Sequence, residues 1–347
     1  MVQSVLTPLA ILSAPFEDRP PSTNHGFCIE GCMPNAKFST LIVHIPKAVQ
    51  AGAEILPNCM VTQIEVNREG HVNSVLFVNE GKTYRQRAKT VILSAHVVET
   101  PRLLLHSATP QFPDGLANSS GWVGRAIMTH SSNDVYAKFE QEIRLYKGTP
   151  VFASTQDFYE TDPRRGFARG YTIHSHGSRP IDMAQGISKF SHEPVWRPQL
   201  RQIMLEYNNY GCLTMVGEVL PQWDNHISLS AEKDENGMPR ASVTFKYGAN
   251  DLKLIDHAVE NLKLILKAAG GEVTYVVPDT QHLMGGCRMG KDPATSVVNS
   301  YGQSHDIPNL FICDASLFVT SSGVNPTNTV MAIAARTADY IIDLASS

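Results

Sequence analysis

The stretch Asn309-Leu310-Phe311-Ile312-Cys313-Asp314 decides the fold that this sequence predicts. Its unbroken apolar run is typical of a strand buried on both faces, and the run ends at an aspartate. A loop then leads to Asn325-Pro326, where the proline suits the first turn of a helix. From Val330 to Ile342 apolar residues recur three and four positions apart, which predicts a helix with one buried face. A strand end that faces a helix start is the usual crevice for a nucleotide phosphate.

Three further helices are predicted upstream. The longest runs from Asn250 to Ala269 and ends at Gly270-Gly271. The residues expected on its buried face are Leu252, Ile255, Ala258, Leu262, Ile265 and Ala269. Another helix is expected from Thr40 to Gly52, where apolar residues return at helical spacing. The dipeptide Thr100-Pro101 is expected to cap and open the third helix.

Short strands are predicted around these helices. Val61 to Val66 and Val72 to Val78 alternate in polarity, and a turn at 67–70 joins them. The nearly continuous apolar run from Thr90 to Ala95 predicts a central, buried strand. Residues 134–247 hold strand-like pieces around a polar turn, which suggests an antiparallel sheet built as a separate unit. Residues 13–35 are rich in Pro, Gly, Ser and Asn and are expected to form an irregular loop.

Composition narrows the class of protein. The 347 residues are 42% hydrophobic and 18% charged, which is typical of a globular chain. The 33 acidic and 29 basic residues give a net charge of −4, and the absence of a long basic run argues against nucleic-acid binding. The six cysteines are too scattered for a disulfide scaffold. No segment reaches the roughly 18–20 apolar residues that span a bilayer, and no signal peptide is recognised, so a cytoplasmic location is expected by default.

The candidate functional residues near these elements each have an ordinary structural interpretation. His282 is one of 13 histidines, so a structural role is the common expectation, although imidazole suits acid–base chemistry near neutral pH. Asn325 directly before a proline at a helix start is typical of an N-cap. Asp314 is equally compatible with a turn, and Val61 is equally compatible with a place in the core.

Several motifs, in one order along the chain, nevertheless point to a known family. The run HLMGGCRMG at 282–290 and the tail from Asn309 to the closing helix carry the clearest likeness. The runs NAKFS at 35–39, ETPRLL at 99–104 and LANSSGWVGR at 116–125 add to it. Together they resemble the glucose–methanol–choline (GMC) oxidoreductases over residues 15–345. Ordered motifs over such a span are more specific than any one motif alone.

The resemblance implies an α+β fold of the FAD/NAD(P)-binding, flavin-monooxygenase-like type with an inserted antiparallel-sheet substrate domain. It divides the chain into a first FAD-binding segment at 1–133, a substrate-binding domain at 134–277 and a returning carboxy-terminal segment at 278–347. The family opens with a Gly-x-Gly-x-x-Gly fingerprint, and this pattern occurs nowhere in the sequence. We therefore expect the family's carboxy-terminal two-thirds, with an incomplete fold that lacks the amino-terminal fingerprint.

The resemblance also implies an FAD-dependent oxidoreductase that acts on CH–OH donors, moving hydride from an alcohol to the flavin N5. His282 matches the family's base, and Asn325 matches the partner that positions the oxygen. The implied FAD-binding residues are Val61, Asp314, Ala315, Asn325, Pro326 and Thr327. A small alcohol or sugar-like substrate is expected, and the sequence does not indicate the electron acceptor.

Departures from the family pattern shape the remaining expectations. His96 stands where the family usually has glycine beside the cofactor, and its ring is expected to crowd that path. Only Cys28 and Cys32 remain in a loop that often carries four cysteines, so no metal site is expected. With the fingerprint lacking, a truncated or split enzyme is expected, working with a missing amino-terminal half or another subunit. The alternative is a flavin-free fragment or subunit without catalysis.

Overall fold

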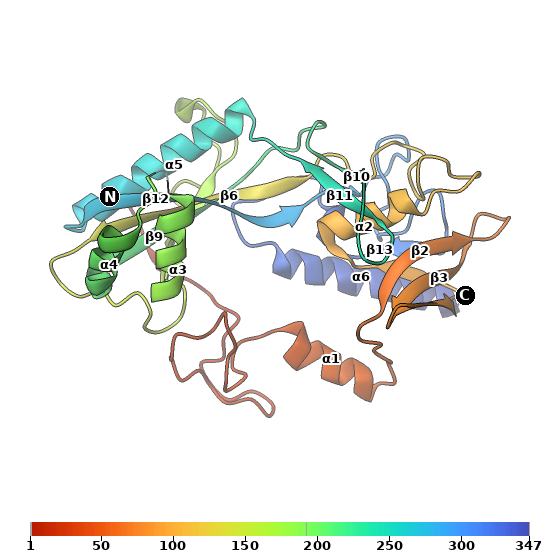
Figure 1. Cartoon of the computed structure of the whole chain (residues 1–347), viewed down its shortest axis with the longest axis horizontal. Helices are drawn as coiled ribbons and strands as arrows, with labels where there is room; N and C mark the ends of the chain where they lie inside the picture. The colour runs from red at the N-terminus through yellow and green to blue at the C-terminus, as the bar shows by residue number, and fades with distance from the viewer. Residues whose placement is uncertain (1, 192, 347) are drawn as a thin grey trace. The chain divides into compact units, whose positions relative to one another are not determined.

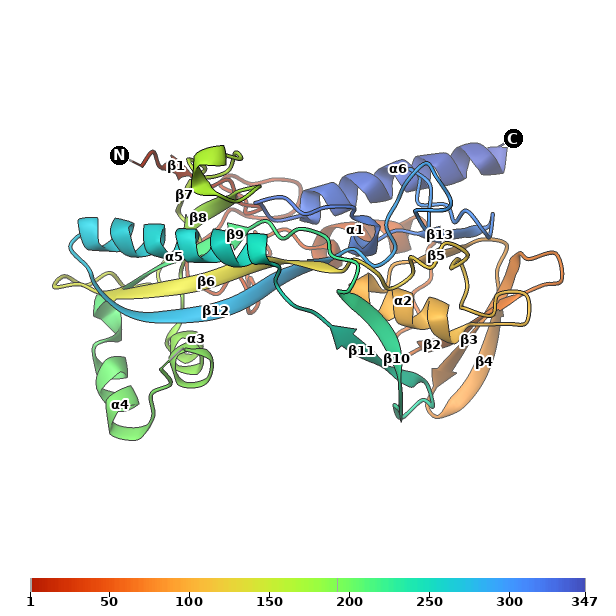
Figure 2. The ribbon, with the colours of Figure 1, turned by 90° about the horizontal axis from the view of Figure 1, so that it is seen from above.

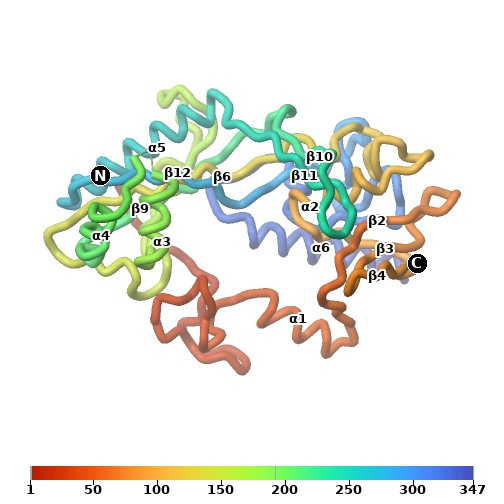
Figure 3. Tube along the Cα trace, in the orientation of Figure 1, coloured from red at the N-terminus to blue at the C-terminus, as the bar shows by residue number. Residues whose placement is uncertain are grey.

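The computed structural model describes residues 2–191 and 193–346. The chain forms two compact units, each assembled from three separate stretches of sequence. These stretches can be followed by colour along the trace in Figure 3. The first unit comprises Met1–Ile55, Ser131–Glu218 and Asn250–Gln281, and the second comprises Leu56–His130, Val219–Ala249 and His282–Ser347. These units differ from the predicted ranges 1–133, 134–277 and 278–347, because 1–55 joins the antiparallel sheet and 219–249 does not.

A six-stranded sheet forms the centre of the first unit. Its strand order is β1-β7-β8-β9-β6-β12, and the pairs from β1 to β6 are antiparallel. The strands are β1 Val5–Leu6, β6 Met128–Lys138, β7 Ala153–Thr155, β8 Tyr171–Ser175, β9 Tyr210–Gly217 and β12 Glu272–Met284. An antiparallel sheet is therefore present in the middle of the chain, but the strand-like pieces around the polar turn at 234–237, from which it was predicted, form a separate hairpin in the second unit.

One face of this sheet is covered by the long helix α5, Ala249–Ala268, which runs beside β6 and β12 in Figure 2. The helix buries Leu254, Ala258, Leu262 and Leu266 against apolar side chains of the sheet such as Val135 and Met215. The helix was predicted correctly, but its predicted face was partly wrong, since Leu252 is 51% exposed. Repeated steps of four residues, which follow one ridge of the helix, define the face that packs.

Short helices cover part of the other face. They are α3 Pro180–Gln185, the π-helical turn η2 Gly186–Phe190 and α4 Arg197–Leu205, with 3₁₀ turns η1 Pro163–Arg165 and η3 Tyr207–Asn209. Their Met183, Ile187 and Ile203 pack against Tyr136 and Cys212 of the sheet. The amino-terminal stretch contributes α1, Thr40–Gln50, which confirms the predicted helix but buries none of its residues. Residues 13–35 form no helix or extended strand, as expected.

The second unit contains three small sheets. The meander β2 Met60–Val66, β3 Val72–Asn79 and β4 Lys82–Arg87 is antiparallel, β5 Val91–Leu93 and β13 Leu310–Ile312 are parallel, and β10 His226–Lys233 and β11 Pro239–Thr244 form a hairpin. The predicted strands at 61–66, 72–78, 90–95 and 309–313 are confirmed. Strand β4 was not predicted, because every residue of that strand is exposed and its sequence shows no alternation of polar and apolar residues.

Two side chains, Asn309 and Arg102, connect the sheets and helices of this unit. The amide of Asn309 bonds the backbone of Val72 and Lys89, which joins the meander to the parallel pair. Arg102 of α2, His96–His106, forms ion pairs with Glu99 and with Asp234 in the β10–β11 turn. Figure 1 shows the hairpin lying beside α2. Arg102 is only 6% exposed, so this pair is partly desolvated and fixes the hairpin's place.

Two helical predictions need correction. The helix α2 begins at His96 rather than at Thr100-Pro101, because Asp314 accepts a hydrogen bond from the backbone N–H of His96 and anchors the first turn. The closing helix α6, Thr327–Ser346, is present, but its predicted apolar stripe is buried only in part: Thr337 is buried, Val330 and Ile333 are half-buried, and Ile342 is 61% exposed. Within the described residues, no helix combines the length and apolar character needed to cross a membrane.

Candidate active site

His282 lies near the end of β12 in a strained backbone conformation. Its φ is +57°, a region that non-glycine residues rarely adopt. Gly285 and Gly286 follow with φ of +81° and +99°, and a Cβ at Gly285 would come within 2.5 Å of the Ala126 carbonyl oxygen. The backbone N–H of Gly285 donates to the Ala315 carbonyl, which ties this turn to the 3₁₀ turn η4, Ala315–Leu317. The glycines therefore allow the sharp turn that presents the His282 ring.

Asn325 meets His282 from a distant part of the sequence. It lies exposed in the loop immediately before Pro326 and α6. Its Nδ2 atom lies 3.0 Å from His282 Nε2, although 43 residues separate the two in sequence. The structure thus brings together the two residues for which catalytic roles were predicted, and the Asn325 side chain contacts an imidazole.

His130 is a third member of this group, and the sequence analysis missed it. It lies on β6, is fully buried, and its Nδ1 is 2.9 Å from His282 Nδ1. Burial, and then the charge of His282, lower the pKa of His130 to about 4. The available sequence signal was a run of six polar residues, from Thr129 to Asp134, between two apolar segments.

Asp314 organises the backbone around the end of β13. Its Oδ2 accepts hydrogen bonds from the His96 N–H at 2.9 Å and the Thr100 hydroxyl at 2.6 Å. Its Oδ1 accepts one from the Ser316 N–H at 2.8 Å. His96 has φ +73°, so it occupies a backbone conformation that favours glycine, and its side chain is exposed. Asp314 therefore clamps two chain turns, which is the role of a turn aspartate.

The other predicted cofactor residues differ in exposure. Val61 is half-buried on β2 and packs against one core cluster, whereas Ala315 is buried in another. Pro326 is buried, and Thr327 is exposed at the start of the 20-residue helix α6. The first N–H groups of a helix lack partners within it, and the helix dipole makes that end positive. Among the predicted cofactor residues, the exposed hydrogen-bond donors are therefore the Asn325 amide and the backbone N–H groups in the first turn of α6.

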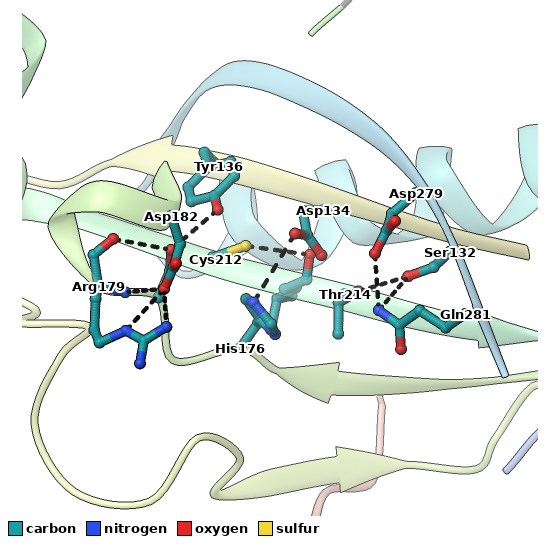
Figure 4. Close-up of polar contacts among 12 residues, drawn as sticks. Ser132, Asp134, Tyr136, His176, Arg179, Asp182, Cys212, Thr214, Asp279 and Gln281 are labelled. Atoms are coloured by element: carbon teal, nitrogen blue, oxygen red, sulfur yellow. Dashed lines mark hydrogen bonds and ion pairs between the residues drawn. The ribbon is translucent and has the colours of Figure 1, made fainter. Parts of the chain in front are cut away.

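A separate polar cluster lies in the first unit. Figure 4 shows Asp134 of β6 opposite His176, with Asp134 Oδ2 and His176 Nε2 3.9 Å apart. The Ser132 hydroxyl lies 3.2 Å from that of Thr214, and both are buried. Burial raises the pKa of the Asp134 carboxyl above its ordinary value. In the described residues the sheet therefore carries a costly buried carboxyl group, which bears on its stability.

Cys28 and Cys32 are both free thiols in the amino-terminal loop. Burial, and then the nearby Cys32, raise the pKa of the Cys28 thiol. Across residues 2–191 and 193–346, no three His, Cys, Asp or Glu side chains are arranged to hold a metal ion.

Comparison with known protein families shows which family this chain belongs to. The GMC oxidoreductase amino-terminal model matches residues 12–132, and the carboxy-terminal model matches 221–334, together well over half of the chain. The chain belongs to the GMC oxidoreductase family. The first match contradicts the expectation of a chain that lacks the amino-terminal fingerprint segment, since residues 12–132 match the family's amino-terminal model, although no Gly-x-Gly-x-x-Gly occurs in the sequence.

Curated GMC relatives share about a third of their aligned residues with this chain. A 2-methyl-1,2-propanediol dehydrogenase of Mycolicibacterium austroafricanum is 33% identical over 96% of this chain. The fructose dehydrogenase large subunit of Gluconobacter japonicus is 31% identical over 97% of it. The chain spans 62% of the length of each of these two relatives.

Solved structures show that the GMC fold is shared. Pyridoxine 4-oxidase from Mesorbium loti superposes with a TM-score of 0.67 at 17% identity, covering 88% of this chain and 61% of the other. Formate oxidase of Aspergillus oryzae gives 0.62 at 17% identity, covering 82% and 60%. The α+β fold is thus that of the FAD-binding GMC oxidoreductases, and FAD is the cofactor that this membership assigns.

The donor set at the start of α6 fits FAD. The exposed first turn, Thr327–Thr329, presents backbone N–H groups at the positive end of a long helix beside the Asn325–His282 pair. Such donors suit an electron-rich acceptor edge such as the carbonyl edge of a flavin ring. The three side-chain hydrogen bonds of Asp314 are made within the chain, which indicates that it shapes the backbone after β13.

Proposed function

We propose that this chain takes part in the FAD-dependent oxidation of alcohol CH–OH groups. The observation that carries the proposal is the 3.0 Å contact between His282 Nε2 and the Asn325 amide, both delivered by segments with the family's motifs. Removing hydride from an alcohol carbon requires the hydroxyl proton to leave as well, so the reaction needs a base within hydrogen-bond reach of the oxygen. An imidazole and a neighbouring carboxamide meet that requirement.

His282 serves as the base and Asn325 as the group that positions the hydroxyl oxygen. The Nε2 atom of His282 faces the amide nitrogen of Asn325, which can donate a hydrogen bond but cannot accept one. Nε2 therefore accepts and carries a lone pair. That lone pair takes the hydroxyl proton. Asn325 lies in an exposed loop and donates to the alcohol oxygen, which keeps the oxygen beside the base. Bound FAD supplies the acceptor for the hydride.

The residues proposed to hold FAD are Val61, Asp314, Ala315, Asn325, Pro326 and Thr327. Asn325 and the first turn of α6 contribute donors, and the backbone that Asp314 clamps contributes shape. The relatives named for 2-methyl-1,2-propanediol and fructose support a small alcohol or sugar-like substrate. Because those relatives are longer than this chain, we also propose that full activity draws on additional polypeptide, in the same protein or in another subunit.

The test measures flavin and its reduction. Visible flavin absorbance of the purified protein, with and without added FAD, is followed by anaerobic mixing with 2-methyl-1,2-propanediol or fructose. We expect a flavin spectrum that the alcohol bleaches. A protein that stays colourless with added FAD and with longer versions of the chain would support the alternative, a flavin-free subunit without catalysis.

The roles of the two residues are tested by substitution. His282→Ala should slow bleaching by about 10²- to 10⁴-fold, the usual contribution of a general base, while the flavin spectrum persists. Asn325→Ala should cost about 10²- to 10³-fold, as for the loss of one preorganised donor. The matched controls are His71→Ala and Asn73→Ala, exposed residues of the same unit that should leave the rate unchanged. Undiminished bleaching by His282→Ala would remove that residue from its role.

A further inference from the structure

The buried imidazole of His130 contacts His282 at Nδ1, the ring nitrogen that does not contact Asn325. The rings of His130 and His282 meet edge to face, with centroids 5.1 Å apart and an interplanar angle of 74°. Their Nδ1 atoms lie 2.9 Å apart, which is a hydrogen-bond distance. Such a contact between two imidazole nitrogens requires one to donate and the other to accept.

The contacts of His282 fix where each hydrogen lies. The Asn325 amide nitrogen donates, so His282 Nε2 accepts and carries no hydrogen. A neutral imidazole has one N–H, and for His282 this must then be Nδ1–H. It donates to His130 Nδ1, so the hydrogen of a neutral His130 lies on Nε2. The three side chains thus form a directional chain from Asn325 through His282 to His130.

We propose that His130 is a positioning residue that holds His282 in the Nδ1–H tautomer and in the ring orientation that leaves Nε2 basic. The catalytic consequence rests on the proposed function, whereas the tautomer is a property of the chain itself. A buried partner on the second ring nitrogen of a working histidine commonly sets its tautomer. Here the partner is an imidazole, where a carboxylate or a carbonyl is more usual.

The surroundings keep His130 uncharged. Burial disfavours its protonated form, and a positive charge on His282 disfavours it further, while a backbone group of Ser322 acts in the opposite direction. Within the described residues His282 is the titratable side chain that acts on it, and the neighbouring strand ends carry the apolar Ile127, Met128 and Met284. A pKa of about 4 leaves His130 neutral at physiological pH.

A neutral partner has a different effect from a carboxylate. After His282 takes a proton on Nε2, its Nδ1–H still donates to His130, so the ring keeps its place. A carboxylate would favour the protonated imidazole more strongly and would raise the pKa of the base. The neutral His130 therefore orients His282 without committing it to the charged form, which keeps Nε2 available near neutral pH.

The experiment combines a tautomer measurement with a pH profile. Nitrogen chemical shifts of labelled histidines in the wild-type protein should report Nδ1–H for His282, assigned by its loss in His282→Ala. In His130→Leu that preference should weaken, because only the Asn325 contact then favours it, whereas His130→Gln, whose amide oxygen can accept from Nδ1–H, should retain it. An exposed histidine variant, His71→Gln, controls for general effects. An Nε2–H tautomer in the folded wild type overturns the inference, even if the Leu variant does not fold.

Kinetics separates positioning from bulk structure. His130→Leu should lower kcat/KM for the alcohol by about 10- to 100-fold, as partners of this kind do, and should move the His282 inflection in the pH profile to lower pH. His130→Gln should recover most of the rate. Equal losses in both variants with an unmoved profile would mean that His130 has only a packing role. If wild-type protein shows the Nδ1–H tautomer but no alcohol bleaches its flavin, the proposed function fails and the tautomer assignment stands.

Discussion

At the residue scale, left-handed backbone occurs at two histidines in or beside the motifs that carry the family likeness. His96 and His282 both have φ in the left-handed region, where a Cβ is disfavoured. The surrounding bonds explain why His96 tolerates this conformation: its N–H is held by Asp314, and Asp314 is held in turn by Thr100 and Ser316. Such strain persists where neighbouring contacts over-determine the backbone.

Replacing His96 with glycine should therefore stabilise the protein. Glycine adopts φ +73° without a steric penalty, the bond to Asp314 uses only the backbone N–H, and the exposed ring makes no core contact. We expect His96→Gly to raise the free energy of unfolding by about 1 kcal/mol, the lower end of the cost of such strain. Urea unfolding measures it. The neighbouring Ala95→Gly, at φ −90°, should destabilise instead, and a gain there would contradict the explanation.

At the element scale, the first unit contains two carboxyl groups whose pKa values are shifted in opposite directions. Asp134 on β6 is 16% exposed, and its Oδ1 is shielded from solvent without a hydrogen bond in the described part of the chain. By contrast, the half-buried Asp162 before η1 accepts hydrogen bonds from the side chain and N–H of Arg164, which lower its pKa to about 2. The first carboxylate opposes folding when ionised, and the second favours it.

The substitution Asp134→Asn should stabilise the protein at neutral pH. A raised pKa means that the folded state binds the proton more tightly than the unfolded state, so the contribution of Asp134 to stability falls as pH rises from the ordinary aspartate pKa through the raised one. The gain should vanish at acidic pH, where both states are protonated. Unfolding curves across pH measure it. The pKa of Asp162 is lowered, so Asp162→Asn should destabilise the protein at neutral pH. If both variants changed the stability in the same direction, this account would be refuted.

At the scale of the whole molecule, the chain alternates between its two units along the sequence, so neither unit is a continuous segment. It also leaves apolar side chains in solvent: Leu41 of α1 is 69% exposed, and Ile342 of α6 is 61% exposed. Exposed apolar surface of this kind favours association when charge repulsion is weak. The sequence pI of 6.3 marks the pH at which the net charge, and hence that repulsion, is smallest.

Self-association should therefore peak near pH 6.3. Static light scattering of the purified protein should rise towards that pH and fall on either side. The double variant Leu41→Gln and Ile342→Gln removes apolar surface without changing charge, and it should lower the peak. Thr83→Gln, an exposed position on β4, is the matched control and should not alter the scattering. A peak that is equal in all three proteins would trace the association to charge alone.

The sequence by itself determined the family, the cofactor, most helices and strands, and the two residues that meet at the site. It could do so because these depend on local patterns: apolar spacing, turn residues, and the ordered motifs at 282–290 and 309–326. Only the tertiary structure decided the rest. Four features depend on which distant segments pack together: the place of His130, the buried face of α5, the start of α2 at His96 and the exposure of α6. One chain's local spacing does not encode those contacts, because burial and hydrogen bonding are set by neighbours far away in sequence.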